Sequence, residues 1–293
     1  MGFKDKVILI CKQMDPIKQY IHESWKSVDP YRFPGPQPIS IERRHFSILK
    51  KNMYLVCEKT DGVRYVLISH PLSPNVTLVN RMFSAEYVFK LAGFPKDTIL
   101  DGELVTLKNG KQVYAVYDAV RVKGHDCREM NLIERLEMAR AAVKRIIKSK
   151  NDLFEVKVKT MVPLSELKNL PPLSEYEYET DGIVMTPVHE PVRIGTHETM
   201  FKWKPLNKNT VDFMIKDGKD LYVQDRGVPY REGQLHRLNQ VDLPDGTIVE
   251  CEYGDVGWKV IKVRTDKDYP NNRRTYARTC VNLQENIQLY ELC

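Results

Sequence analysis

A lysine at the end of a short apolar run is the first residue in this sequence that could do chemistry. Lys59 follows the strand-like YLVCE and begins the hexapeptide KTDGVR. A lysine becomes a nucleophile only when it loses its proton, so nearby cations or a metal must favour the neutral amine, whose reference pKa is about 10.4. Asp61 and Gly62 predict a tight turn, and Arg64 offers donors to a ribose or phosphate oxygen. The hexapeptide also fits an exposed lysine before a hairpin.

Carboxylates next to glycine recur at two later positions. Asp101 and Glu103 flank a glycine in TILDGELV, and Asp181 precedes one in TDGIV. Mg²⁺ prefers oxygen ligands and typically takes one or two carboxylates together with substrate phosphate. These carboxylates could therefore serve a divalent ion. Each pair alone also fits ordinary turn chemistry, because Asp-Gly is common in hairpins.

Basic side chains gather in two further segments. Lys202 and Lys204 of FKWKP would project to one side of a strand, because strand side chains alternate. Such a pair could stabilise the charge that develops on an α-phosphate. The segment WKVIKVRTDK ends in Arg264, Asp266 and Lys267, which could clamp a leaving pyrophosphate. Either segment could instead be the solvated basic edge of a sheet.

The elements that must position these residues are mostly short strands. Apolar runs rich in Val, Ile and Tyr, broken by Gly, Asn and Pro, predict strands across residues 54–122. Residues 84–93 are predicted as a short helix. Residues 128–148 are predicted as a longer one, because Leu132, Leu136, Ala139, Val143 and Ile147 recur at helical spacing.

The second part of the chain reads as a smaller β domain. A polar stretch at residues 204–210 predicts a break and a hinge, and about five short strands follow it, which fits a small barrel. Residues 275–292 have helical character. We therefore predict an α+β chain with a large mixed domain at residues 1–206 and a β-barrel domain at residues 207–293.

Composition sets the class of protein. The chain has 293 residues, 42% of them hydrophobic, with 45 Lys and Arg against 39 Asp and Glu for a net charge of +6. These values allow a sizeable core and exclude a disordered chain. The six cysteines contain no C-x-x-C pair, which indicates reduced thiols rather than a zinc site or disulfide framework. The apolar run at residues 7–11 is too short for a membrane span, so we expect an intracellular protein.

The order of the motifs is more informative than any one of them. KTDGVR, LDGELV, YAVYDAV, TDGIV, FKWKP and VRTDK follow one another as in the covalent nucleotidyltransferases, which are the ATP-dependent DNA ligases, RNA ligases and mRNA capping enzymes. The resemblance extends from about Met53 to Lys267. FPGPQPISI, the Thr after the lysine, the Trp in FKWKP and VRTDKDYPN resemble the capping enzymes. This family implies a nucleotidyltransferase domain of antiparallel sheets with helices, followed by an OB-fold β-barrel.

The resemblance also implies a role for each matching residue. Lys59 matches the nucleophile, and Tyr117 of YAVYDAV matches the aromatic ring that stacks on guanine, although a tyrosine there also fits a core strand. Glu103 and Asp181 match carboxylates that bind a divalent metal, Mg²⁺ or Mn²⁺, and Asp101 is expected only to shape a turn. The residues matched to GTP binding are Arg64, Arg81, Glu103, Tyr117, Lys202, Lys204, Arg264, Asp266 and Lys267.

The implied activity is that of an mRNA capping guanylyltransferase, which transfers GMP from GTP through a lysyl–GMP to the 5′-diphosphate end of RNA. The sequence has no H-C-x-x-x-x-x-R phosphatase signature and no methyltransferase glycine-rich motif. We therefore expect the RNA triphosphatase and the cap methyltransferase on separate chains. The phosphorylated tail of RNA polymerase II is a further expected partner, and the expected location is the nucleus, or a virus-infected cell.

Two other functions remain open at this point. An ATP-dependent polynucleotide ligase would use the same lysine chemistry with a different nucleobase. A nucleic-acid or polymerase-tail binding module on a decayed transferase fold would need neither the lysine nor the carboxylates, and the presence of both sets disfavours it.

Overall fold

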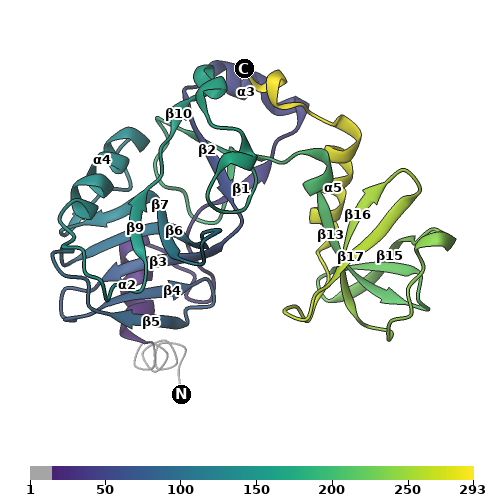
Figure 1. Ribbon diagram of the computed structural model, residues 1–293, viewed down its shortest axis with the longest axis horizontal. Coiled ribbons are helices and arrows are strands. Elements are labelled where there is room, and N and C mark those ends of the chain that lie inside the picture. The colour runs from purple at the N-terminus through teal and green to yellow at the C-terminus, as the bar shows by residue number, and fades with distance from the viewer. Residues whose placement is uncertain (1–14) are drawn as a thin grey trace, which may run out of the picture. The chain divides into compact units, whose positions relative to one another are not determined.

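The computed structural model of the chain describes residues 15–293 (Figure 1). The contacts among these residues divide the chain into two compact units. Unit 1 contains residues 15–39, Asn52–Thr180 and Val184–Phe201, and unit 2 contains Ser40–Lys51, Asp181–Ile183 and Lys202–Cys293. The chain thus passes into unit 2 more than once, and the single boundary between residues 206 and 207 stays a prediction.

The main sheet of unit 1 has seven strands. Their order is β5-β4-β3-β6-β7-β8, with β9 beside β7; the β7–β9 pair is parallel and the other pairs are antiparallel. The strands are β3 (Val63–Ser69), β4 (Val76–Asn80), β5 (Ala85–Phe89), β6 (Thr98–Thr106), β7 (Gln112–Val122), β8 (His125–Asp126) and β9 (Glu155–Val158). The strand predictions for β3, β4, β6 and β7 are confirmed.

The short helix predicted at residues 84–93 is wrong, because this segment contains strand β5. Tyr87 and Phe89 pack against the core while Glu86 and Val88 are exposed. This alternation has the two-residue period of a strand, and pairing with β4 satisfies its backbone.

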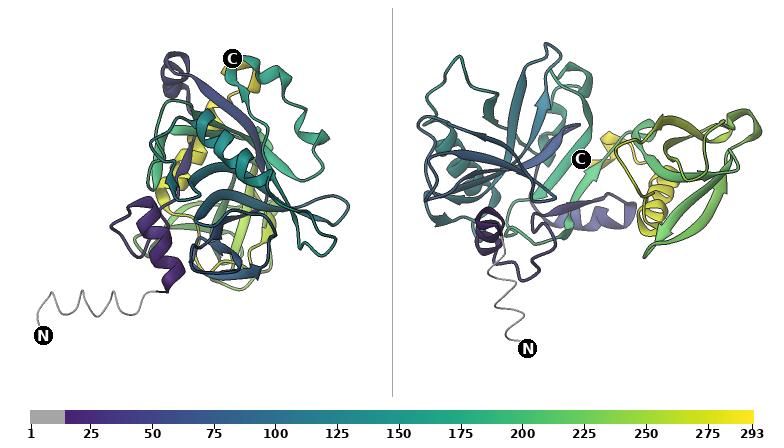
Figure 2. Two further views of the ribbon diagram at one scale, coloured as in Figure 1. Left: turned by 90° about the vertical axis from the view of Figure 1, so that its left-hand side faces the viewer. Right: turned by 90° about the horizontal axis from the view of Figure 1, so that it is seen from below.

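Helices cover the two faces of this sheet (Figures 1 and 2). Helix α2 (Pro16–Trp25) packs its buried side chains against Val66 and Ile68 of β3. The alternate residues of β3, Tyr65 and Leu67, belong to the cluster that contains buried alanines of α4 (Leu132–Val143). Because strand side chains alternate between faces, α2 and α4 lie on opposite faces.

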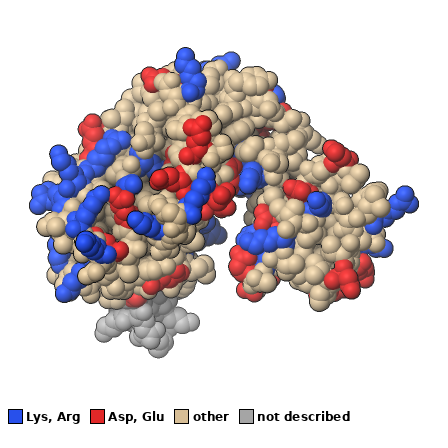
Figure 3. All heavy atoms as spheres, viewed as in Figure 1, with Lys and Arg blue, Asp and Glu red and all other residues tan. Residues whose placement is uncertain are grey.

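Helix α4 is shorter than the helix predicted over residues 128–148. The side chain of Asn131 accepts a hydrogen bond from the Glu134 N–H and Glu134 bonds back, a capping box that fixes the first turn. Arg135 is buried and donates to both carboxylate oxygens of Asp118 on β7, at 2.7 and 3.0 Å. Ile147 lies beyond the helix and is exposed. Lys and Arg side chains gather on the surface over α4 (Figure 3).

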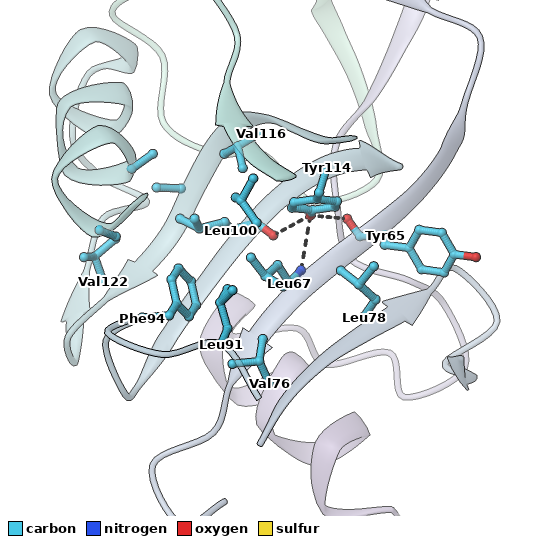
Figure 4. Close-up of a cluster of buried hydrophobic side chains, with 14 of the residues drawn as sticks. Tyr65, Leu67, Val76, Leu78, Leu91, Phe94, Leu100, Tyr114, Val116 and Val122 are labelled. Atoms are coloured by element: carbon cyan, nitrogen blue, oxygen red, sulfur yellow. Dashed lines mark hydrogen bonds between the residues drawn. The ribbon is translucent and has the colours of Figure 1, made fainter. Parts of the chain in front are cut away.

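A buried hydroxyl lies within the apolar core under α4 (Figure 4). Tyr114 of β7 is fully buried, and its hydroxyl lies 2.8 Å from the Tyr65 carbonyl and 3.0 Å from the Leu100 carbonyl. It also accepts from the Leu67 N–H at 3.2 Å. This hydroxyl therefore contacts the backbones of β3 and β6 from β7.

A second sheet has five strands in the order β1-β12-β11-β2-β10. The chain passes between the two units within β11 and β12. The strands are β1 (Gln37–Ser40), β2 (Tyr54–Thr60), β10 (Val162–Pro163), β11 (Thr180–Pro187) and β12 (Thr196–Trp203). The short helices near them are η1 (Arg43–His45), α3 (Phe46–Lys51), η2 (Leu164–Asn169) and η3 (Leu173–Glu175).

Unit 2 contains the small β domain. Its five antiparallel strands are ordered β15-β14-β13-β16-β17, an open order, so the described residues form an OB-like sheet without the closed barrel that was predicted. The strands are β13 (Thr210–Lys216), β14 (Asp220–Asp225), β15 (Val228–Gln234), β16 (Ile248–Gly254) and β17 (Gly257–Val263), with helices η4 (Leu206–Lys208), η5 (Arg237–Asn239), α5 (Arg273–Glu285) and η6 (Leu289–Leu292). Helix α5 confirms the predicted helical end. Within residues 15–293 no helix is long and apolar enough to cross a membrane.

Candidate functional site

Lys59 is the second-last residue of β2 and is held between two buried neighbours. The ammonium of Lys159, itself buried, donates to the Glu58 carbonyl at 2.9 Å and lies 3.1 Å from the Thr60 hydroxyl. It also pairs with the Glu58 carboxylate at 3.2 Å, and Tyr178 donates to the same carboxylate at 2.8 Å. The backbone on either side of Lys59 is therefore fixed, while the Lys59 side chain is partly exposed.

Arg64 and Asp101 form a buried clamp on the neighbouring strands. Arg64 of β3 lies opposite Glu103 of β6, so Asp101, two residues before Glu103, is its diagonal neighbour on the same face. Arg64 donates to the two carboxylate oxygens of Asp101 at 3.0 and 2.5 Å. The Tyr117 hydroxyl donates to Asp101 at 2.8 Å. One carboxylate therefore positions both an arginine and a tyrosine.

The residues before β1 complete the surroundings of Arg64. The Arg64 guanidinium donates to the Pro36 carbonyl at 2.7 Å and lies 5.1 Å from the centroid of the Phe33 ring. Gly35 leaves no room for a side chain, because a Cβ there would come within 2.4 Å of the Arg64 Nη2. The segment FPGP, which resembles the capping enzymes, therefore packs directly on Arg64.

Tyr117 owes its direction to a β-bulge. In the pairing of β6 with β7, Asp101 lies opposite Asp118 and Gly102 lies opposite Val116, so Tyr117 is the extra residue. A bulge of this kind leaves one residue unpaired and re-aims its side chain, and bulges are frequent next to active sites. The bulge allows Tyr117 to reach Asp101 while the adjacent Asp118 reaches Arg135.

The clamp keeps its members in defined protonation states. Burial alone would lower the pKa of Arg64, but the Asp101 carboxylate and other neighbours hold it above its ordinary value, so the guanidinium stays charged. Burial raises the pKa of Tyr117 well above its ordinary value, and the nearby Asp101 carboxylate raises it further. Tyr117 therefore stays a neutral phenol that donates a hydrogen bond.

Two further predicted residues lie beside this clamp. Glu103 accepts a hydrogen bond from the Thr60 hydroxyl, which joins the end of β2 to β6. Arg81 follows β4 in the turn before β5, and its side chain is exposed. Partial desolvation and then the positive charge of Arg64 lower the pKa of Arg81. Unit 1 thus brings together four predicted residues, Lys59, Arg64, Glu103 and Tyr117, and also contains Arg81.

The predicted residues at the start of β11 and the end of β12 belong to unit 2. Lys204 pairs with the Asp181 carboxylate at 2.6 Å. Lys202 and Lys204 are partly exposed on either side of buried Trp203, as the predicted alternation requires. Gly182 has φ +151°, and a Cβ there would lie 1.9 Å from the Trp203 carbonyl oxygen. The close approach of the two strands therefore requires glycine after Asp181.

The RTDK segment is organised by a residue that the sequence did not suggest. Asp212 of β13 is buried, accepts from Arg264 at 2.8 Å and from Asn271 at 3.2 Å, and pairs with Lys267. Arg264 also forms two 2.8–2.9 Å hydrogen bonds with Asp266, which raise the pKa of Arg264 and lower that of Asp266. The three predicted residues of this segment are thus gathered around Asp212.

The candidate carboxylates could bind a divalent cation only if substrate oxygens or waters supply its other ligands. Residues 15–293 contain no group of three or more His, Cys, Asp or Glu side chains that could hold a metal by themselves. Mg²⁺ does not need such a group, because it commonly keeps waters and substrate phosphates among its ligands. Glu103 in unit 1 and Asp181 in unit 2 carry the hard oxygen donors that such an ion prefers.

Asp101 corrects the expectation that it only shapes a turn. It lies within β6, is 1% exposed and is the shared acceptor of the clamp. The sequence does contain a signal for this role: Asp101 lies two residues before Glu103 in the same predicted strand, so the two side chains share a face. Lys159, Tyr178 and Asp212 were also missed, and no local pattern indicates them.

The structure thus contains an α+β unit with a seven-stranded sheet and a second unit with a small antiparallel β domain, and the candidate residues lie in both units. The family model described as the mRNA capping enzyme catalytic domain matches residues 6–206, and that of the mRNA capping enzyme C-terminal domain matches residues 198–293. The chain belongs to the mRNA capping enzyme family.

Individual relatives agree with this family. The mRNA-capping enzyme of Danio rerio is 27% identical over 290 residues, covering 87% of this chain and 48% of that protein. The mRNA-capping enzyme subunit alpha of Schizosaccharomyces pombe is 25% identical, covering 90% of this chain and 79% of that protein. The chain thus spans about half the length of the animal relatives. The ATP-dependent DNA ligase of bacteriophage T7 in complex with ATP has a TM-score of 0.47 at 14% identity, covering 79% of this chain and 98% of that one.

Proposed function

We propose that this chain is a GTP:RNA guanylyltransferase that carries GMP on Lys59 and transfers it to the 5′-diphosphate end of RNA. The observation that carries the proposal is the position of Lys59. It lies at the end of β2 between residues fixed by Lys159, and Thr60 connects it to Glu103 beside the clamp. Membership in the capping enzyme family supports this activity.

The reaction has two balanced half-reactions. In the first, the neutral amine of Lys59 forms a P–N bond with the α-phosphorus of GTP while the P–O bond to the β-phosphate breaks. Pyrophosphate leaves with the electron pair, and the amine loses its second proton to solvent. In the second, an oxygen of the terminal RNA phosphate attacks the same phosphorus, the P–N bond breaks, and Lys59 regains a proton. The product is GpppRNA, and the covalent intermediate lets one site serve two acceptors.

The residues of unit 1 act on the nucleoside and orient it for this attack. Arg64 has N–H donors beyond those that face Asp101 and Pro36, and these can bind a ribose oxygen. Tyr117 supplies a ring on which guanine can stack. Because the clamp holds both groups before substrate arrives, little reorganisation is needed during the reaction.

The residues of unit 2 act on the phosphates. Lys202 and Lys204 would bind the α-phosphate, and Arg264, Asp266 and Lys267 would act on the β- and γ-phosphates of GTP. A phosphoryl transition state spreads charge over its oxygens, so positioned cations supply most of the stabilisation. A divalent ion held by Glu103 and Asp181 would supply further neutralisation of phosphate charge.

The expected partners and location belong to the same proposal. The fission yeast relative is named a subunit, which describes that protein as part of an assembly. We propose that a triphosphatase prepares the RNA end for this chain and that a cap methyltransferase acts on its product, in the nucleus of a cellular source.

Labelling with nucleotide tests the function directly. Incubation with GTP or ATP labelled on the α-phosphate, followed by denaturing electrophoresis, should label the protein from GTP. The label should be absent in Lys59→Ala and present in Lys90→Ala, an exposed control in the same unit. Label from ATP alone would instead establish a polynucleotide ligase, and label in Lys59→Ala would exclude Lys59 as the nucleophile.

A further inference from the structure

A large hollow lies on unit 1, apart from the residues described above. Its volume is about 1050 Å³. It is bordered by the turn between β6 and β7, by the end of α4, and by residues 146–158, which include β9. Figure 3 shows Lys and Arg side chains gathered on this side of the unit.

The border of the hollow is strongly basic. Six basic side chains line it against two acidic ones, Asp152 and Glu155, which leaves a net charge of +4 compared with +6 for the whole chain. The six are Lys111, Arg140, Lys144, Lys148, Lys150 and Lys157. Lys148 and Lys157 pair with Glu155, at 2.6 and 2.9 Å. The other four form no ion pair with any residue of the described part of the chain, so their charge is available to an anionic ligand.

The floor of the hollow is apolar. Leu91, Val113, Phe154 and Val156 are buried beneath it, while Leu153 at its margin is 57% exposed. A basic border around an apolar floor suits a single-stranded nucleic acid, because its phosphates can contact the cations while its bases lie on the apolar surface. Simple counter-ions would need no such floor.

The chain runs from β9, at the border of the hollow, directly to a buried lysine that contacts both neighbours of Lys59. Lys157 lines the hollow, and Lys159 bonds the Thr60 hydroxyl next to Lys59. The two lysines lie on the same side of the chain because strand side chains alternate, and Lys159 continues the pairing with β7 through its N–H, at 2.8 Å from the Val116 carbonyl. Two residues of strand span about 7 Å, so the backbone at the border of the hollow lies close to the backbone of Lys159.

We propose that this basic hollow binds the RNA acceptor through its backbone phosphates, downstream of the end that receives GMP. The inference rests on the proposed function, since that function supplies the RNA. Only two residues separate Lys157, which lines the hollow, from Lys159, which contacts both neighbours of Lys59; this favours RNA over a phosphorylated peptide, because the acceptor must also reach Lys59. The contacts are with phosphates and the apolar faces of bases, so binding depends on length and salt rather than on sequence.

A charge-reversal variant tests this site. Lys111→Glu, Lys144→Glu and Lys150→Glu together reverse three exposed cations that take no part in the proposed chemistry. The control reverses Lys26, Lys96 and Lys123, which are equally exposed in unit 1 and do not line the hollow. Binding of a 20-nucleotide RNA with a 5′ diphosphate is measured against salt. The slope of log affinity on log salt should become shallower by about 2 in the variant, since single strands lose about 0.7 per phosphate contact.

Steady-state transfer separates the hollow from the catalytic site. In the variant the KM for the 20-nucleotide acceptor should rise about tenfold at low salt, while the KM for a two-nucleotide acceptor and the rate of lysyl–GMP formation should not change. The control variant should behave as the unaltered protein does. An equal loss in the control, or an unchanged salt slope in the hollow variant, would overturn the inference.

Binding of a phosphoserine peptide to the same variants tests the alternative ligand. If the peptide binds and the hollow variant loses peptide but not RNA, the hollow is a phosphopeptide site and the inference is wrong. If no variant forms lysyl–GMP, the proposed function has failed, and the direct RNA-binding measurement still decides whether the hollow binds RNA.

Discussion

Replacing Asp101 by Asn removes the charge that the buried Arg64 guanidinium faces, with little change in shape. The side chains are 1% and 10% exposed, so solvent screens the pair weakly. Removing one member of a buried ion pair costs about 3–5 kcal/mol, because the other charge stays buried without compensation. Asn keeps one acceptor oxygen, so we expect a loss near the lower limit, about 3 kcal/mol in the free energy of unfolding. For a unit of this size that loss lowers Tm by about 6–12 °C.

The same substitution should slow the first half-reaction. Arg64 and Tyr117 would lose their common acceptor, and a displacement of about 1 Å in a positioning group costs about 10²-fold in rate. The rate constant of lysyl–GMP formation is measured in a single turnover with labelled GTP. The temperature is chosen well below the Tm of every variant, and circular dichroism verifies that each is folded.

Asp118→Asn is the matched control. Asp118 also accepts two hydrogen bonds from a buried arginine, Arg135, and follows Tyr117 directly in the chain, but it faces α4. This variant should lose a similar amount of stability and keep the rate of lysyl–GMP formation. A rate in Asp101→Asn within threefold of the unaltered protein would refute the clamp. So would a loss in Asp118→Asn as large as that in Asp101→Asn.

Two further outcomes follow from the structure. Gly182→Ala should lower Tm by thermal denaturation, since its methyl group would meet the Trp203 carbonyl and its φ costs about 1–3 kcal/mol; Gly195→Ala, with positive φ but open space around it, should lose less. Burial raises the pKa of the Cys57 thiol to about 12, so iodoacetamide at pH 8 should modify exposed Cys293 and spare Cys57 until denaturant is added, as measured by peptide mass spectrometry.

The strands could be predicted where each carries its own apolar pattern. The runs of β3, β4, β6 and β7 were identified because Val, Ile and Tyr occur between clear turn signals. Strand β15 carries no such pattern, because VPYREGQ contains a proline and two charged residues and is largely exposed. It is a strand only because its backbone pairs with β14 at the edge of the sheet, and a single sequence does not contain that pairing partner.

The site could be predicted as far as residue types and spacing reach. Lys59, Glu103 and Lys204 were identified from the order of motifs along the chain. The role of Asp101 depends on the register of β3 against β6, which no local pattern contains. The direction of Tyr117 depends on one extra residue in β7, and Lys159 reaches Thr60 from 99 positions away. Pairing register, bulges and long-range contacts are properties of the folded chain.

The buried hydroxyl of Tyr114 has a consequence for when the clamp forms. A hydroxyl has one proton, so at any instant it donates to the carbonyl of either Tyr65 or Leu100 while it accepts from the Leu67 N–H. The hydroxyl thus bonds with the backbones of both β3 and β6, the strands that carry Arg64 and Asp101. Separating β3 from β6 would take the Leu67 N–H and the Tyr65 and Leu100 carbonyls away from this shared partner. Leaving buried backbone groups unpaired is costly, so we expect the two strands to unfold cooperatively. Arg64 and Asp101 therefore belong to one cooperative folding unit, and the shape that a nucleotide meets is set when the protein folds.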